Sequence, residues 1–383
     1  MRALVGITVV SVEQAVAAPF ATRQLADLGA RVIKVERPEG DFARAYDRAV
    51  RGWSSHFVWL NRSKESVVLD LKTSRGREAL SRLLQRADVF VQNLSPGALD
   101  RLGFGPEEVS RRHPQLVVCS ISGYGTTGPY RDRKAYDLLI QAESGLLSIT
   151  GTPEEPVKVG ISVADIAAGM YALSGILAAL YRRERTGRGA LLEVSLLDSL
   201  AEWMGYPLYY TAYRGHPPAR TGAHHATIAP YGPFPTADGV VFLAVQNDRE
   251  WERFCREVLG RPELAHDPRF ATNPDRVRHR PALEALIRET FRGLSTAQLT
   301  QRLEAADVAY GELRTVQGLL EHPQLAARDR WRQVDSPVGP LLALLPPFSV
   351  PGEEPSLGPV PRLGEHTESV LREIGMEPEE VRP

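Results

Sequence analysis

The chain is poor in cysteine and has no excess of charge of either sign. Its 383 residues include only Cys119 and Cys255, which lie far apart in the sequence. Two such cysteines build neither a disulfide framework nor a zinc motif, and they suit a reducing compartment, so we expect a cytoplasmic protein. The formal net charge is −1. No overall basic field therefore points to a nucleic acid partner.

The sequence also has little that would suit a membrane. The apolar run that follows Asp165 is uncharged for 16 residues and ends before Arg182. This is shorter than the roughly 20 residues that a membrane span needs, and Gly169 and Gly175 interrupt it. We therefore interpret the run as a buried helix and expect no membrane partner.

What the sequence does have is a regular alternation of strand and helix patterns. Hydrophobic residues make up 43% and charged residues 24%, which is typical of a globular protein, and the length suits two domains. Residues 3–12 and 31–36 read as strands on either side of a helix over 20–30, which predicts a parallel βαβ unit. The pattern continues with strands over 66–71, 88–93, 116–124 and 190–196, a helix over 74–87 and a long helix over 197–215.

The fold class expected from this pattern is α/β. A doubly wound, Rossmann-like large domain would take residues 1–205 and 325–383, and a smaller α+β domain would take 222–320. Residues 206–221 and 321–324 would be linkers. In the small domain we expect a hairpin near 229–245 and helices over 249–260, 280–294 and 295–307.

The first strand-to-helix turn lacks glycine. Glu36 ends the second strand, where a dinucleotide-binding fold places an acid for a ribose hydroxyl. The preceding turn, "SVEQAVAAPF", contains no glycine, so its backbone cannot approach a pyrophosphate closely. The sequence therefore argues against a nicotinamide enzyme.

Three cations follow predicted strands. Arg37, Lys72 and Arg101 fall at the carboxyl edge of the sheet, where open α/β sheets bind ligands. Such a group suits a polyphosphate ligand. The alternative is that these are ordinary solvated loop charges.

Asp165 is a lone carboxylate at the start of the apolar helix. In one interpretation it caps the helix or occupies its first turn, where it stabilises the helix dipole by about 1 kcal/mol. In the other it is a poorly hydrated carboxylate that stays ionised near the helix N-terminus and acts as a nucleophile.

Adjacent histidines occur in "GAHHATIAPYGPFP", residues 222–235. A metal site would need more ligands at workable spacing, and only His216 lies near, so we expect none. Either histidine could act in catalysis or bind a carboxylate, or the segment could be a polar linker turn.

Several segments together resemble one family. They are "LADLGARVIKVERPEGD", "NRSKESVVLDLKT", "VQNLSPGALDRLG", "ISGYGTTGPY", "AYDLLIQAESGL", "DIAAGMYALSGILAALYRRERTGRG" and "LGEHTESVL". The chain resembles the class III (CaiB/BaiF-type) coenzyme A transferases over nearly its whole length. The resemblance implies a homodimer of two ring-like chains threaded through each other, with active sites near the dimer interface. It also implies acyl-CoA and a carboxylic acid as substrates and no tightly bound cofactor.

The resemblance further assigns roles to residues. Asp165 would be the covalent nucleophile, and a backbone N–H near Gln14 and Ala15 would steady an oxyanion. The residues implied to bind CoA are Gln14, Ala15, Arg37, Leu69, Lys72, Asn93, Leu94, Arg101, Leu102 and Lys134.

One position departs from the racemases of this family, which carry a histidine where this chain has Tyr136. A tyrosine with a pKa near 10 is a poor substitute as an acid/base group.

The 224–234 segment looks like that of transferases that use succinyl-CoA and C4–C5 dicarboxylates. We expect Tyr136, Arg220, His224 and His225 to contact the acceptor acid, with a histidine protonated near pH 6–7. The alternatives are an α-methylacyl-CoA racemase and a non-catalytic CoA-binding protein.

Overall fold

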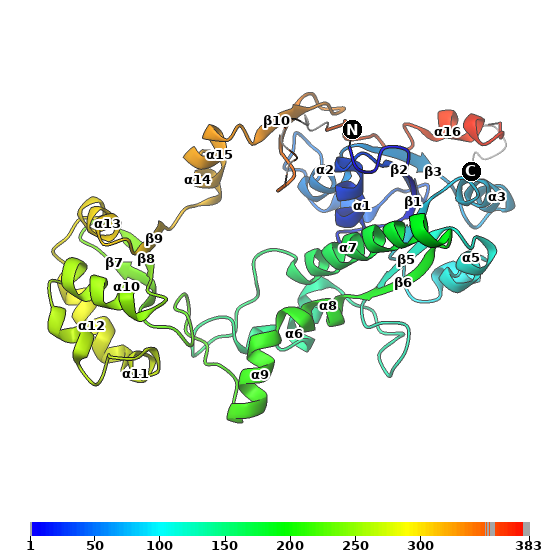
Figure 1. Cartoon of the computed structure of the whole chain (residues 1–383). Coiled ribbons are helices and arrows are strands. Elements are labelled where there is room, and N and C mark those ends of the chain that lie inside the picture. Colours follow the sequence, from blue (N-terminus) through cyan, green and yellow to red (C-terminus); the bar gives the residue numbers. More distant parts are fainter. Residues whose placement is uncertain (1, 349, 351, 353–356, 378–383) are drawn as a thin grey trace. The chain divides into compact units, whose positions relative to one another are not determined.

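The computed structural model describes residues 2–348, 350, 352 and 357–377. The chain divides into two compact units (Figure 1). The large unit comprises Met1–Ser144, Val159–Met204 and Leu325–Pro383, and the small unit comprises Gly145–Lys158 and Gly205–Gln324. This division differs from the expected one, because residues 145–158 and both presumed linkers, 206–221 and 321–324, belong to the small unit. Residues 206–214 of the first linker are part of a helix.

A six-stranded parallel sheet organises the large unit, and it confirms the expected α/β class. Its strand order is β3-β2-β1-β4-β5-β6, so the order reverses between β1 and β4. The register pairs Val10 with Ile33 on one side and with Phe90 on the other. The strands are β1 (Thr8–Val12), β2 (Arg31–Glu36), β3 (Lys64–Val68), β4 (Val89–Gln92), β5 (Val117–Ser122) and β6 (Ala190–Ser195).

Helices cover both faces of this sheet, as its apolar strands require. One face packs a core that includes Leu80 of α3, Val109 of α5 and Leu371 of α16. The other face carries α1 and α7, which lie side by side (Figure 1). The helices of the large unit are α1 (Ala17–Asp27), α2 (Ser55–Asn61), α3 (Ser74–Leu84), α4 (Ala98–Arg101), α5 (Pro106–Arg112), α6 (Asp137–Glu143), α7 (Val163–Thr186), α8 (Leu196–Trp203) and α16 (Thr367–Glu373), with a short turn at Phe42–Ala45 and a hairpin of β10 (Trp331–Val334) and β11 (Leu341–Leu344).

Three predicted elements have different bounds in the structure. The first strand begins at Thr8 rather than at residue 3, because Gly6 turns the chain at a φ of 92°. The strand predicted over 66–71 is β3, which begins earlier, at Lys64, and ends at Val68 because a turn closed by Thr73 N–H and Asp70 O begins two residues later. The long helix over 197–215 is two helices that meet at Met204, α8 and α9 (Gly205–Arg214).

The C-terminal segment returns to the edge of the sheet at β3. Thr367 Oγ1 accepts the N–H of Val68 (3.0 Å), and His366 Nδ1 accepts the N–H of Ser66 (3.2 Å). In return, His366 donates its N–H to Ser66 O (3.0 Å). These contacts satisfy backbone groups that an edge strand would otherwise expose.

The apolar helix α7 has the features expected from its sequence. It begins at Val163 and ends at Thr186, and the next residue, Gly187, caps the last turn with a φ of 68° and an N–H bond to Arg183 O. A Cβ at Gly169 would lie 2.7 Å from Ala17 O, so glycine is required for the close approach of α1. By length and composition α7 could cross a membrane, but half of its most apolar window is buried, and core helices pass the same test.

The small unit is an antiparallel sheet with helices around one core. The sheet order is β7-β8-β9, and Phe234, Trp251 and Phe291 lie fully buried in the core. The elements of this unit are a 3-10 turn at Leu146–Ser148, α9, β7 (Tyr231–Pro235), β8 (Val240–Ala244), α10 (Asp248–Arg253), a π-helical turn at Phe254–Val258, a 3-10 turn at Pro262–His266, α11 (Asn273–Arg278), α12 (Arg280–Phe291), α13 (Thr296–Ala305), β9 (Ala309–Glu312) and α14 (Val316–Leu320). The chain passes from this unit into the large unit within α15 (Pro323–Ala327).

Candidate active site

Asp165 lines a cavity of about 580 Å³ in the large unit, here called the Asp165 cavity. Its walls include the segments that follow β1, β4 and β5. These segments flank the reversal of strand order, where open parallel sheets bind ligands. The cavity also includes the starts of α1, α6 and α7 and part of the segment between β2 and β3. The expected site residues that line it are Gln14, Ala15, Arg37, Asn93, Leu94, Lys134, Tyr136 and Asp165.

The Asp165 carboxylate does not cap its own helix. Ser162 is the N-cap residue, and the first turn is capped from another helix, because Asp137 Oδ1 of α6 accepts the N–H of Ala164 (2.8 Å). The other oxygen of Asp137 accepts from the Gln141 amide (2.7 Å). Within the part of the chain that the structure describes, the Asp165 carboxylate accepts no hydrogen bond. Asp165 thus lies in the first turn of α7, as one interpretation expected, but its side chain does not cap the helix.

The surroundings of Asp165 favour its neutral form. Burial, and then the nearby charge of Asp137, raises the pKa of Asp165 to about 7. The expectation that this group would stay fully ionised is therefore wrong, because desolvation outweighs the favourable end of the helix dipole. Near neutral pH this carboxylate can therefore still ionise, and when ionised it is poorly solvated.

A second cavity, of about 220 Å³, adjoins the first. Both cavities are lined by Gln14, Arg37 and Leu94. We call it the Leu69 cavity, because the buried side chain of Leu69 forms part of its wall. It also includes the expected CoA contacts Lys72 and Leu102. Arg101, on α4, is exposed and lines neither cavity.

The turn after β1 does not present the N–H groups that we expected to steady an oxyanion. The N–H of Gln14 donates to Asn93 Oδ1 (2.9 Å), and the N–H of Ala15 donates to Asp41 Oδ1 (3.1 Å). Ala15 has a φ of 62°, which is unusual for a residue other than glycine. The next two residues, Val16 and Ala17, line the cavity at the start of α1, and among the described residues their N–H groups have no partner.

Two aromatic residues of the Asp165 cavity, Tyr46 and His56, are not singled out in the sequence predictions. Tyr46 and His56 come from the segment between β2 and β3, and their rings meet edge to face with centroids 5.3 Å apart. His56 Nδ1 lies 3.5 Å from Asp47 Oδ2. Burial raises the pKa of Tyr46 to about 12, helped by the charges of Asp41 and Asp165. Nothing in the local sequence marks Tyr46 or His56 as site residues, whereas Asp137 lies in a segment that the resemblance already used.

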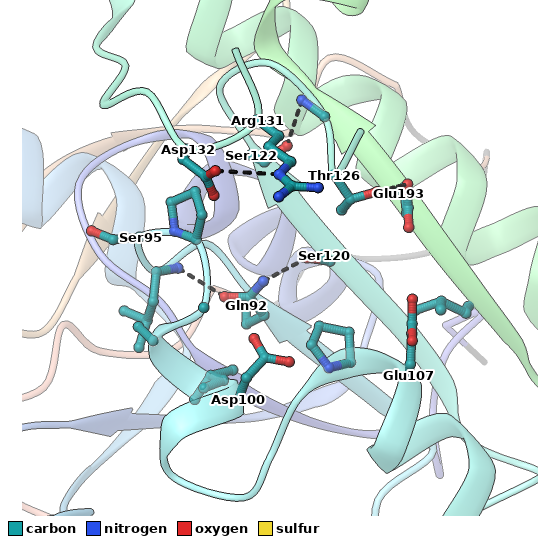
Figure 2. A pocket seen from close by; sticks show the side chains of 18 residues that line it. Gln92, Ser95, Asp100, Glu107, Ser120, Ser122, Thr126, Arg131, Asp132 and Glu193 are labelled. Carbon is teal, nitrogen blue, oxygen red and sulfur yellow. Dashed lines mark hydrogen bonds and ion pairs between the residues drawn. The ribbon is translucent and has the colours of Figure 1, made fainter. Parts of the chain in front are cut away.

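A third cavity, of about 310 Å³, is lined in part by the loop after β4 (Figure 2). It shares Leu94, Ser95, Pro96 and Ser122 with the Asp165 cavity. Gln92 donates to Ser120 Oγ across its floor. Its acidic side chains would repel phosphates; they are Asp100, Glu107, Asp132 and Glu193.

The remaining expected site residues belong to the small unit, where each already has a partner. Arg220 donates from Nε to Thr152 O and from Nη2 to Pro153 O, both at 2.8 Å. His224 Nδ1 lies 3.2 Å from Glu284 Oε1, and the His225 ring stacks on Tyr231 with centroids 5.2 Å apart.

Burial lowers the pKa of both histidines of this segment. Nearby Arg280 lowers the pKa values of His224 and His225 further, although Glu284 opposes this at His224. The protonation that we expected near pH 6–7 is therefore disfavoured. Among the residues that the structure describes, no group of three His, Cys, Asp or Glu could hold a metal ion.

Comparison with known proteins agrees with this geometry. The family described as CoA-transferase family III matches residues 4–367. The acetyl-CoA:oxalate CoA-transferase of Acetobacter aceti is 38% identical, over 85% of this chain and 84% of its own length. The succinate–glutarate CoA-transferase of Agrobacterium fabrum is 36% identical, over 97% and 95%. A CAIB/BAIF family protein from Brucella suis, solved as a crystal structure, superposes with a TM-score of 0.84 at 36% identity, over 97% of this chain and 99% of that one.

These matches extend across both units of the chain and confirm the resemblance read from its sequence. The relatives named as enzymes transfer CoA between acids. The protein therefore belongs to the family III CoA-transferases.

Proposed function

We propose that this enzyme transfers CoA from succinyl-CoA to a small C4–C5 dicarboxylic acid, through an aspartyl-CoA thioester on Asp165. The observation that supports this most strongly is the Asp165 carboxylate itself. It lines a large cavity, accepts no hydrogen bond from the described residues, and is held partly desolvated beside Asp137. A carboxylate in this state is a better nucleophile than one in water.

The proposed reaction begins with attack of Asp165 Oδ on the carbonyl carbon of the donor thioester. The carbon–sulfur bond breaks, CoA leaves as the thiolate, and a mixed anhydride of Asp165 and succinate remains. The thiolate then attacks the Asp165 carbonyl and releases succinate. This leaves an aspartyl-CoA thioester.

The acceptor repeats these steps in reverse. Its carboxylate attacks the aspartyl thioester, expels the thiolate and forms a second anhydride. The thiolate attacks the acyl carbon that came from the acceptor, which yields the new acyl-CoA and restores the Asp165 carboxylate. Each step exchanges one activated acyl bond for another, so the overall transfer is close to thermoneutral.

The positions of the cations support binding of the CoA nucleotide in the Leu69 cavity. Arg37 and Lys72 line the Leu69 cavity, which suits the adenine and phosphates of CoA. Lys134 lines the Asp165 cavity and would bind a phosphate or the distal carboxylate of an acid. The acidic cavity shown in Figure 2 would repel both a phosphate and a carboxylate.

The names of related enzymes support a dicarboxylate acceptor. Proteins 33–38% identical to this chain are named for oxalate, glutarate, citramalate and mesaconate. A distal carboxylate entering a desolvated site needs a cation or several donors. We propose that Arg220, His224, His225 and Tyr136 contribute to this selectivity, with the histidines acting as neutral donors.

The test is a transfer assay with succinyl-CoA and matched acceptors. Glutarate should give a higher kcat/KM than the monocarboxylate pentanoate, and Asp165→Ala should abolish transfer to both. His225→Ala should reduce the preference for the dicarboxylate, while Arg269→Ala, an exposed arginine of the same unit paired with Asp267, should not change it. Preference for the monocarboxylate, or full transfer by Asp165→Ala, would refute the proposal.

A racemase is the second candidate because of His56. Racemisation needs two groups that exchange an α-proton. Asp165 and His56 both line the cavity, and Asp47 lies close enough to orient the imidazole. Incubation of a 2-methylacyl-CoA in deuterated water distinguishes the two, because only a racemase incorporates deuterium at the α-carbon without an acceptor acid.

A further inference from the structure

The turn that begins the Asp165 cavity is held by one buried carboxylate. Asp41 Oδ1 accepts the N–H of Ala15 (3.1 Å) and the N–H of Ala43 (2.9 Å). Asp41 Oδ2 accepts from Lys34 Nζ (2.8 Å), and both side chains of this pair are fully buried. Asp41 thus connects the second strand, the segment that follows it and the turn after β1.

The conformation of this turn needs such support. Ala15 lies at a φ of 62°, where an alanine is strained by about 1 kcal/mol or more. On the other side, Asn93 Oδ1 accepts the N–H of Gln14 and Asn93 Nδ2 donates to Gln14 O. Asn93 thereby fixes Gln14, and Asp41 fixes the strained residue that follows it.

We propose that Asp41 is a positioning residue for the reaction at Asp165. By holding Ala15 in the left-handed conformation, Asp41 sets the direction in which α1 begins. Val16 and Ala17, whose N–H groups have no partner among the described residues, then line the cavity and stabilise the oxyanion formed at each acyl transfer. The inference rests on the proposed function, because it assigns a role to the surroundings of Asp165 in that reaction.

A purely structural role for Asp41 makes a different prediction. Asp41 is also the N-cap of the short turn at Phe42–Ala45 and the partner of Lys34. If it served only these purposes, its loss would lower stability and CoA affinity, and the rate of acylation would not depend on the conformation of Ala15. The test must therefore separate the bond to Ala15 from the ion pair.

Two double variants make this separation. Lys34→Met/Asp41→Asn and Lys34→Met/Asp41→Ala have the same charge, and Lys64 still pairs with Glu13 in both (2.7 Å). Replacing both members of a buried ion pair is far less costly than removing one. The two variants differ in whether residue 41 carries an oxygen that can accept the N–H of Ala15. We call these the Asn double variant and the Ala double variant. A third variant adds Ala15→Gly to the Ala double variant, because glycine adopts a positive φ without support from other residues.

The measurement is the single-turnover rate at which succinyl-CoA modifies Asp165, with the Kd of CoA and the thermal midpoint as controls. The Asn double variant should react about 10- to 100-fold faster than the Ala double variant, because misplacing a catalytic group by about 1 Å costs up to about this factor in rate. The Kd of CoA should agree between them within about threefold, which is less than half the energy of one hydrogen bond to a charged group. Adding Ala15→Gly should raise the rate of the Ala double variant.

Equal rates for the two double variants, or no gain from Ala15→Gly, would overturn the role of Asp41. Failure of the proposed function gives a different result. In that case the wild type itself forms no adduct at Asp165, and the variants are not needed to show it.

Discussion

Replacing Asp165 by asparagine should stabilise the protein at neutral pH and not in acid. In the folded protein, burial and the charge of Asp137 hold the pKa of Asp165 at about 7, against 3.8 for a solvated aspartate. Between these values the folded state binds more protons than the unfolded state. The free energy of unfolding of the wild type therefore falls as the pH rises from about 4 to about 7, and this contribution is constant above pH 7.

The size of the effect follows from the shift. The pKa rises by about 3 units, and each unit corresponds to about 1.4 kcal/mol, so the cost of ionising Asp165 reaches about 4 kcal/mol at pH 8. The neutral amide of the Asp165→Asn variant carries no such cost. The difference in free energy of unfolding between Asp165→Asn and wild type should therefore rise by about 2–4 kcal/mol between pH 5 and pH 8.

Urea unfolding at matched protein concentration measures this difference. Titrating groups that do not interact with Asp165 contribute equally in the two proteins and cancel, whereas the coupled groups Asp137 and Tyr46 contribute to the measured difference. Asp238→Asn is a suitable control, because hydrogen bonds from Thr296 hold the pKa of Asp238 below its usual range, so its variant cannot gain stability as the pH rises to 8. If the difference for Asp165→Asn were the same at pH 5 and pH 8, Asp165 would not be the desolvated carboxylate described here.

Three further predictions follow from the site. Asp137→Asn keeps an oxygen for the cap of α7 but removes a charge, so the pH midpoint of kcat/KM should fall below about 7; an unchanged midpoint would contradict the role of Asp137 at Asp165. Lys72→Ala should weaken CoA binding, measured by calorimetry, by about 1–3 kcal/mol, and Arg101→Ala should weaken it less, because of these two residues only Lys72 lines the Leu69 cavity. A larger loss for Arg101→Ala than for Lys72→Ala would contradict the assignment of the CoA phosphates to this cavity. We also expect a homodimer, because α9 exposes several tyrosines, so light scattering should give twice 42.3 kDa; an active monomer would refute this.

The parts of the fold that depend on local pattern were predictable from the sequence. The apolar alternation placed β1, β2, β4, β5 and β6, and Gly187 marked the end of α7. Asp165 stood out because it is the single charge before a long apolar helix. The bounds of β3 were less predictable, because the turn at Asp70–Thr73 competes with an apolar pattern that continues to Leu71.

Contacts between distant segments could not be read in the same way. The cap of α7 comes from Asp137, which lies 27 residues before Ala164. Without this contact in view, Asp165 itself is the natural candidate for the cap. The desolvation that raises its pKa likewise depends on cavity walls that come from segments far apart in the sequence. The positive φ of Ala15 has no sequence signal at all, because alanine rarely adopts it.

The central claim is that Asp165 becomes covalently attached to CoA, and mass spectrometry of the protein tests this most directly. After incubation with succinyl-CoA and removal of free ligand, the intact mass should rise by that of CoA less one water. Digestion should place the adduct on the peptide that contains Asp165, and hydroxylamine should remove it. An unmodified Asp165 under conditions of full turnover, or an adduct on a different residue, would contradict the account.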